Sequence, residues 1–151
     1  MELKYISCTI NIWDCLMISS LSGVDDDHMG SLIFEYEYAI GDYITFTKKV
    51  ISGMFAGTYG FCLSCDSLKE AVLALSEMYK ELKGAYQIND YDSDDYVLFE
   101  FAKQGHLKIS GQVGGSHNQQ YLVYQFMSDQ TVLNEIILYF RNACSTAKLE
   151  G

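Results

Sequence analysis

The 151-residue sequence contains no proline, one tryptophan and half as many basic as acidic residues. Without proline there is no proline-rich linker between two domains. A hydrophobic content of 49% is enough for a core and argues against disorder. The sequence therefore predicts a single domain over residues 1–147, and residues 148–151 are interpreted as a candidate cloning tail.

Long apolar runs are also missing. No stretch reaches the 18 to 20 apolar residues that a membrane-spanning helix needs, so no contact with a membrane is expected. The first ten residues, MELKYISCTI, lack the basic region and uninterrupted apolar stretch of a signal peptide and alternate as a strand does. A cytoplasmic location is therefore expected.

Basic residues are scarce, with 10 Lys and Arg against 20 Asp and Glu and a net charge of −10. Binding to nucleic acid or to an anionic membrane needs clustered Lys and Arg, so neither is expected. Negative charge favours basic partners and accelerates their encounter. Solubility alone is the other explanation of such a charge.

The five cysteines are an odd number without the spacing of a disulfide framework, which favours free thiols in a reducing cytosol. Cys62 and Cys65 form one C-x-x-C motif. Zinc usually requires a second such pair or histidines at ligand spacing, and neither is present nearby. Two small residues at the end of a strand are the simpler interpretation.

Motifs of catalysis are absent as well. The sequence has no G-x-S-x-G elbow, and Gly57-Thr-Tyr-Gly60 lacks the lysine and the helix start of a phosphate-binding loop. The three histidines, His28, His106 and His117, lie in separate segments near turns. We therefore predict no catalytic residue, no cofactor and no enzyme activity. The alternative is a small-ligand-binding or metal-binding domain, or an enzyme, that uses the Cys62/Cys65 and His106/His117 regions.

Two acidic segments contain the residue types of a metal site. Asp90-Tyr-Asp92-Ser-Asp94 resembles the opening of a calcium loop, which needs Gly at position six and Glu at position twelve. Here those positions hold Asp95 and Phe101. The segment 25–28, three aspartates and a histidine, is interpreted as a charged loop. No metal site is predicted.

Alternation of apolar and polar residues predicts about seven or eight antiparallel strands. The clearest, 31–40, is expected to place Leu32, Phe34, Tyr36 and Tyr38 on one face and Glu35 and Glu37 on the other. Its return strand is 43–51, after a turn at Gly41-Asp42. Further strands are expected at 3–12, 15–20, 59–63, 96–103, 106–113 and 119–127, and 85–90 is a candidate for a short one.

Two amphipathic helices are predicted, at about 66–83 and 129–143. Ser64 or Asp66 is expected to cap the first and Gly84 to end it, while Asp129 caps the second. Residues 142–151 are expected to fray. Strands and helices in separate runs predict an α+β fold, in which the helices pack on the antiparallel sheet.

The segment from Ser116 to Arg141 carries a family resemblance. The strand opening at Gly105 and the pattern F-x-x-D-Q-T-x-L at 126–133 resemble WapI-type and contact-dependent-inhibition-type bacterial immunity proteins, over roughly the last 45 residues. The resemblance implies a protein that binds and neutralises the C-terminal domain, a nuclease by expectation, of a polymorphic or contact-dependent toxin. The other residues resemble the family only in layout.

Acidic side chains alternate with tyrosines in two runs, 35–38 and 91–96. Carboxylates can hold arginine in a two-pronged geometry, and tyrosine supplies contact area at a low cost in entropy. In 31–40 the alternation is explained equally well by a strand with one solvent-exposed face. The predicted partner-binding residues are Glu35, Glu37, Asp92, Asp94 and Asp95 as charged contacts, with Tyr36, Tyr91 and Tyr96 as packing contacts. The oligomeric state is left open.

Overall fold

The computed structural model describes residues 15–21 and 29–150. The strand predicted at 3–12 and the whole acidic segment 25–28 lie outside these ranges. In the described part of the chain, no helix is long and apolar enough to cross a membrane.

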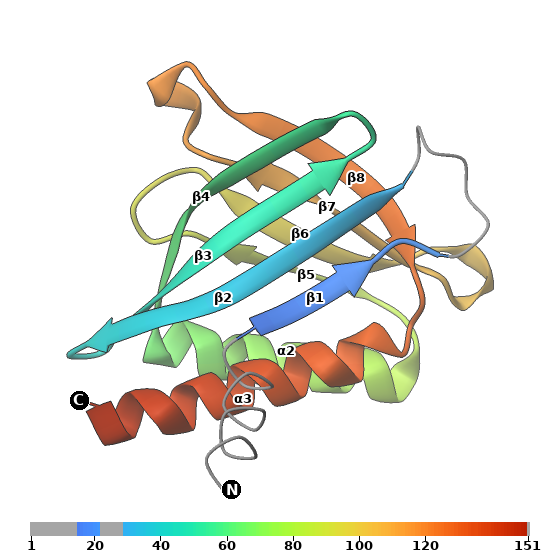
Figure 1. Ribbon diagram of the computed structural model, residues 1–151. Coiled ribbons are helices and arrows are strands. Elements are labelled where there is room, and N and C mark those ends of the chain that lie inside the picture. Colours follow the sequence, from blue (N-terminus) through green and yellow to red (C-terminus); the bar gives the residue numbers. More distant parts are fainter. Residues whose placement is uncertain (1–14, 22–28, 151) are drawn as a thin grey trace, which may run out of the picture.

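The described residues form two four-stranded antiparallel sheets, each in chain order and each followed by one helix (Figure 1). The first sheet comprises β1 (Cys15–Ser19), β2 (Gly30–Ile40), β3 (Tyr43–Ser52) and β4 (Phe55–Ser64), followed by α2 (Cys65–Glu81). The second comprises β5 (Ala85–Asn89), β6 (Tyr96–Phe101), β7 (Leu107–Val113) and β8 (Leu122–Ser128), followed by α3 (Val132–Glu150). Two short 3-10 turns, η2 (Lys103–Gly105) and η3 (Ser116–Asn118), flank β7. The predicted α+β class is confirmed.

The helices lie side by side across one end of the two sheets (Figure 1). An aromatic cluster joins α3 to the first sheet: the Phe34 ring stands edge-on to Phe46 at 5.9 Å, to Phe61 at 5.7 Å and to Phe140 of α3 at 5.5 Å. Strand β8 crosses the inner face of the first sheet, and a Cβ on Gly30 would lie only 2.6 Å from the Phe126 ring. Glycine is therefore needed where β2 and β8 approach most closely.

The predicted alternation is confirmed along β7 and β8, where Leu107, Ile109, Tyr124 and Phe126 are buried. It is wrong at Tyr38. The β2–β3 register shifts between Tyr36 and Tyr38, so a bulge turns Tyr38 to the outer face, where it is 49% exposed. Such an extra residue reverses the faces of all that follow it on the strand.

The helices begin and end differently from the prediction. Ser64 caps α2 as expected, because its side chain accepts a hydrogen bond from the Ser67 amide. The helix ends before Leu82, which adopts a left-handed conformation in place of Gly84. The prediction that α3 ends near 143 and that 142–151 fray is wrong as far as Glu150. The helix continues to Glu150, since Cys144 and Ala147 extend its buried stripe.

A buried ion pair joins the two sheets. The Lys48 ammonium of β3 donates to the Asp95 carboxylate and to the carbonyl oxygens of Tyr96, at 3.2 Å, and Gln112, at 2.9 Å. Both charged side chains are fully buried. All three ammonium donors are used, and the second oxygen of Asp95 accepts from the Gly114 amide at 2.7 Å. A buried ion pair is tolerated when the hydrogen-bonding groups of both charges are satisfied in this way.

Burial sets the direction of both pKa values. It lowers the pKa of Lys48, which the nearby Asp95 carboxylate partly offsets. It raises the pKa of Asp95, against the attraction of Lys48 and the hydrogen bonds that the carboxylate accepts. Each charge therefore depends on the other to remain in the core.

Replacing Lys48 by methionine should lower the free energy of unfolding by about 3–5 kcal/mol, because Asp95 is left buried without its partner. Urea denaturation monitored by circular dichroism measures the loss. Adding Asp95→Asn to Lys48→Met should restore part of it, since the carboxamide oxygen still accepts from Gly114. The control is Lys49→Met on the opposite face of β3, for which we expect a change within about 0.5 kcal/mol. Equal effects of Lys48→Met and Lys49→Met would contradict the assigned role.

Candidate functional site

The acidic loop between β5 and β6 folds against the outer edge of β4. Asp90 accepts a hydrogen bond from the Cys62 amide at 2.7 Å, and the Tyr91 amide donates to the Cys62 carbonyl at 2.9 Å. Ser93 donates to the other Asp90 oxygen at 2.7 Å. The loop thus pairs with β4 at one residue, and Asp90 serves the structure of the loop.

The loop residues predicted to bind a partner divide into two groups. Asp95 is fully buried against Lys48, so the prediction that its carboxylate meets a partner is wrong. Tyr96 is half-buried in β6, and its carbonyl supports the same ammonium. Asp94 is exposed but accepts from the Ser116 amide at 2.9 Å and from the Gln112 amide group at 3.0 Å. These three residues position the loop.

Tyr91 and Asp92 point outward. Tyr91 is 65% exposed, and its ring lies 4.7 Å from that of Tyr43 at the start of β3. Asp92 and Tyr38 line one hollow of about 320 Å³ beside β4, together with Thr45, Tyr59, Gly60, Phe61, Cys62 and Asp90. The structure therefore brings together the ends of the two acidic, tyrosine-containing runs that the sequence singled out.

The remaining predicted residues lie on β2. Tyr36 faces inward, and its ring lies 6.1 Å from that of Phe46, so it packs against the core. Glu35 is half-buried on the outer face, in the row that also contains Cys15 and Thr47. Glu37 is exposed at the bulge and accepts a hydrogen bond from Thr47 at 2.8 Å. The exposed residues that share this region, called the acidic surface below, are Glu37, Tyr38, Tyr43, Tyr91 and Asp92.

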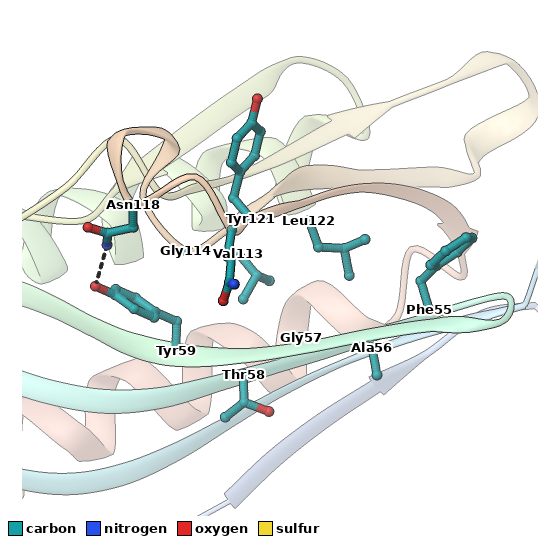
Figure 2. A pocket seen from close by; sticks show the side chains of 11 residues that line it. Phe55, Ala56, Gly57, Thr58, Tyr59, Val113, Gly114, Asn118, Tyr121 and Leu122 are labelled. Carbon is teal, nitrogen blue, oxygen red and sulfur yellow. Dashed lines mark hydrogen bonds between the residues drawn. The ribbon is translucent and has the colours of Figure 1, made fainter.

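A second hollow, which sequence reasoning missed, lies on the inner side of β4 (Figure 2). This cleft of about 480 Å³ separates β4 from the end of β7, η3 and the start of β8. Its walls are Phe55, Ala56, Gly57, Thr58, Tyr59, Val113, Gly114, Asn118, Gln120, Tyr121 and Leu122. The Asn118 amide donates to the Tyr59 hydroxyl at 3.0 Å and bridges the two walls (Figure 2).

Strand β4 separates the two hollows. Its prediction as 59–63 covered only the second half, because Gly57 and Gly60 among aromatics hide the strand pattern. Those glycines were the available signal, since a glycine inside a strand often marks a site where another group approaches closely. At the open end of the strand, Phe55 is 68% and Met54 90% exposed. This part of β4 presents apolar surface to solvent.

The two histidines of the alternative site lie far apart. His106 and His117 are exposed and lie beyond opposite ends of β7, at least about 20 Å apart for a strand of this length. Burial raises the pKa of the Cys62 thiol, so the thiol is protonated at neutral pH. Within the two described ranges, no group of three or more His, Cys, Asp or Glu could hold a metal ion.

Comparison with protein-family models, with curated proteins and with solved structures found no match. The resemblance of the C-terminal segment to immunity proteins therefore stays a prediction. Its residues explain structure: Phe126 and Leu133 are buried in the core, and Asp129 accepts from the Thr131 amide at 2.8 Å in the turn before α3. The candidate functional features of the molecule are therefore the acidic surface and the edge of β4.

The carboxyl of Asp94 should titrate below the ordinary pKa of aspartate, because the Ser116 hydroxyl and amide both donate to its charged form. A lowered pKa means that the contact stabilises the fold above the ordinary pKa of about 3.9 and is lost as the pH falls through the lower, folded value. Carbon-13 NMR of the carboxyl resonance measures the midpoint. Ser116→Ala should move the midpoint upward, while Ser110→Ala, on the neighbouring strand β7, should leave it in place. A normal midpoint in the wild-type protein would contradict the contact.

Proposed function

We propose that this chain is an immunity protein that binds the C-terminal, nuclease-type domain of a polymorphic or contact-dependent toxin through the acidic surface and neutralises it. One observation carries the proposal: the two acidic, tyrosine-containing runs converge, so that Tyr38 of β2 and Asp92 of the loop line one hollow. The resemblance of the last 45 residues supplies the class of partner.

The hollow suits an arginine or lysine side chain. Asp92 is exposed and makes no hydrogen bond or ion pair with any other described residue, so its carboxylate is available to a partner. Tyr38, Tyr43 and Tyr91 provide exposed rings nearby, against which a guanidinium can stack. A charged contact flanked by aromatic rings is typical of the residues that dominate binding energy at interfaces.

The overall charge supports the same class of partner. A nuclease domain that holds a phosphate backbone needs a basic surface. The net charge of −10 attracts such a surface over distances of about a Debye length and accelerates encounter. Binding then depends on the close contacts of the acidic surface, which slow dissociation.

The direct test is co-expression with the toxin domain encoded immediately upstream of this gene. Cells that carry the toxin domain should survive only when this protein is present, and the two proteins should co-purify. The matched control is the same toxin with a catalytic-site substitution, which should be harmless but still bound. Growth of cells that express the active toxin alone would sink the proposal.

Reversing one charge of the acidic surface should slow association. Asp92→Lys is expected to reduce the association rate by about tenfold at low salt, with a smaller difference at high salt, since steering by charge is screened. Stopped-flow or surface plasmon resonance with the toxin domain measures the rate. The control Glu81→Lys changes the net charge equally but lies at the exposed end of α2. Equal slowing by both variants would assign the effect to net charge instead of to this surface.

A further inference from the structure

Strand β4 has an open edge along its first half. It is the last strand of the first sheet, and it pairs with β3 without interruption from Phe55 to Ser64. The amide and carbonyl of Cys62 both point away from β3, because both bond to the acidic loop. In an antiparallel pair every second residue has this orientation. The peptide groups of Ala56, Thr58 and Gly60 therefore point outward along the same edge.

Nothing in the described ranges covers this stretch. The loop reaches the edge only at Cys62, and the outward peptide groups of Ala56, Thr58 and Gly60 make no hydrogen bond to a described residue. At the corner where β1 and β8 end, by contrast, the Leu21 amide donates to the Met127 carbonyl at 3.0 Å and the Ser128 hydroxyl to the Ser19 carbonyl at 2.7 Å.

The composition of β4 also leaves the edge open to pairing. Proteins usually protect a free edge with lysine, proline or a bulge, because unpaired peptide groups are a template for another strand. The sequence of β4, FAGTYGFCLS, has no charged residue and no proline, and its pairing with β3 has no bulge. A ten-residue strand without these features is suited to accept a further strand.

We propose that an extended segment of the partner protein pairs with β4 along Ala56–Gly60 as an additional strand of the first sheet. This inference rests on the proposed function, because it describes how the toxin domain would be held. The acidic loop already occupies the same edge at Cys62, so the added strand continues a pairing that the protein itself begins.

One face of the added strand would lie over the cleft. Residues opposite Gly57 and Tyr59 point to the inner side of β4, where Val113 and Leu122 form the opposite wall (Figure 2). A Cβ on Gly57 would already touch Val113 at 3.4 Å and Leu122 at 3.5 Å, so glycine lets β4 lie close to the opposite wall. A cleft of about 480 Å³ with these walls is suited to one aromatic or branched apolar side chain.

The other face would lie over the acidic hollow. Ala56 and Thr58 point away from the cleft (Figure 2), and an added residue opposite Gly60 points the same way. The space above Gly60 is open, and Asp92 and Tyr38 line the hollow beside it. Because strand residues alternate between faces, the segment that fits both hollows alternates apolar and basic side chains.

A synthetic peptide tests the pairing without the toxin. The acetylated, amidated hexapeptide Lys-Val-Lys-Phe-Lys-Val should shift the nitrogen-15 amide resonances of residues 55–62 and 113–122. A peptide with glutamate in place of lysine should bind at least about tenfold more weakly because of charge repulsion at the acidic hollow. N-methylation of its alternate amides, which removes the pairing groups of one edge, should abolish binding.

Thr58→Pro removes one outward amide and leaves the β3–β4 hydrogen bonds in place, since the Thr58 amide does not face β3. Glycine at position 57 tolerates a following proline without a side-chain clash. We expect affinity for the peptide, and for the toxin domain, to fall about tenfold or more. Thr58→Val is the matched control, because it keeps the amide and alters only the side chain, and it should bind like the wild type. Circular dichroism and the thermal midpoint confirm that both variants fold.

The outcomes separate this inference from the proposed function. Toxin binding that is unchanged by Thr58→Pro would overturn the added strand and leave the immunity function standing. If Thr58→Pro abolishes peptide binding but the wild-type protein does not protect cells against the toxin, the added strand stands and the immunity function is overturned. Three results would overturn the inference outright. They are peptide-induced shifts outside both stretches, no shifts at millimolar peptide, and a dimer of this chain through β4 that Thr58→Pro dissociates.

Discussion

The ion pair between Lys48 and Asp95 determines the arrangement of this molecule. A lysine in the middle of β3 would be costly on the buried face of a sheet unless its charge were compensated. Asp95 provides the opposite charge from the end of the acidic loop. Two carbonyl oxygens of the second sheet accept the remaining hydrogen bonds of the ammonium group. The pair therefore joins the two sheets at a defined point and anchors the loop that carries the candidate site.

The loop illustrates how one acidic segment serves both structure and recognition. Asp90 accepts a hydrogen bond from the Cys62 amide, and Asp94 accepts from Ser116 and Gln112. Asp95 accepts from Lys48 and from the Gly114 amide. These contacts hold the backbone, so Tyr91 and Asp92 project from a rigid support. A charged contact on a fixed loop loses less conformational entropy on binding than one on a mobile loop. The two hollows that flank the edge of β4 follow from the same arrangement. The loop forms one side of the acidic hollow, and the separation of β4 from the ends of β7 and β8 leaves the cleft.

Much of the fold follows from local patterns that can be identified in the sequence. The alternation in 106–113 and 119–127 identified the inward residues of β7 and β8, although β8 begins only at Leu122, and the spacing of apolar residues located α2 to within two residues at each end. The errors have physical causes. The bulge near Tyr36 and the extension of α3 to Glu150 depend on pairing with β3 and on packing against the core, neither of which a local pattern contains. The first half of β4 was missed because its glycines interrupt the alternation, while its pairing with β3 is a contact between distant residues.

What the sequence by itself determined is the class of the fold, the acidic character and the two segments in which carboxylates alternate with tyrosines. These properties are local or summed over the chain, so no contact between distant residues is needed to see them. Only the tertiary structure decided which carboxylates are available. Asp92 and Asp95 are three residues apart in one loop, yet one lines an open hollow and the other is buried against a lysine 47 positions earlier. That difference arises from the packing of the two sheets, as does the open edge of β4 between its two hollows.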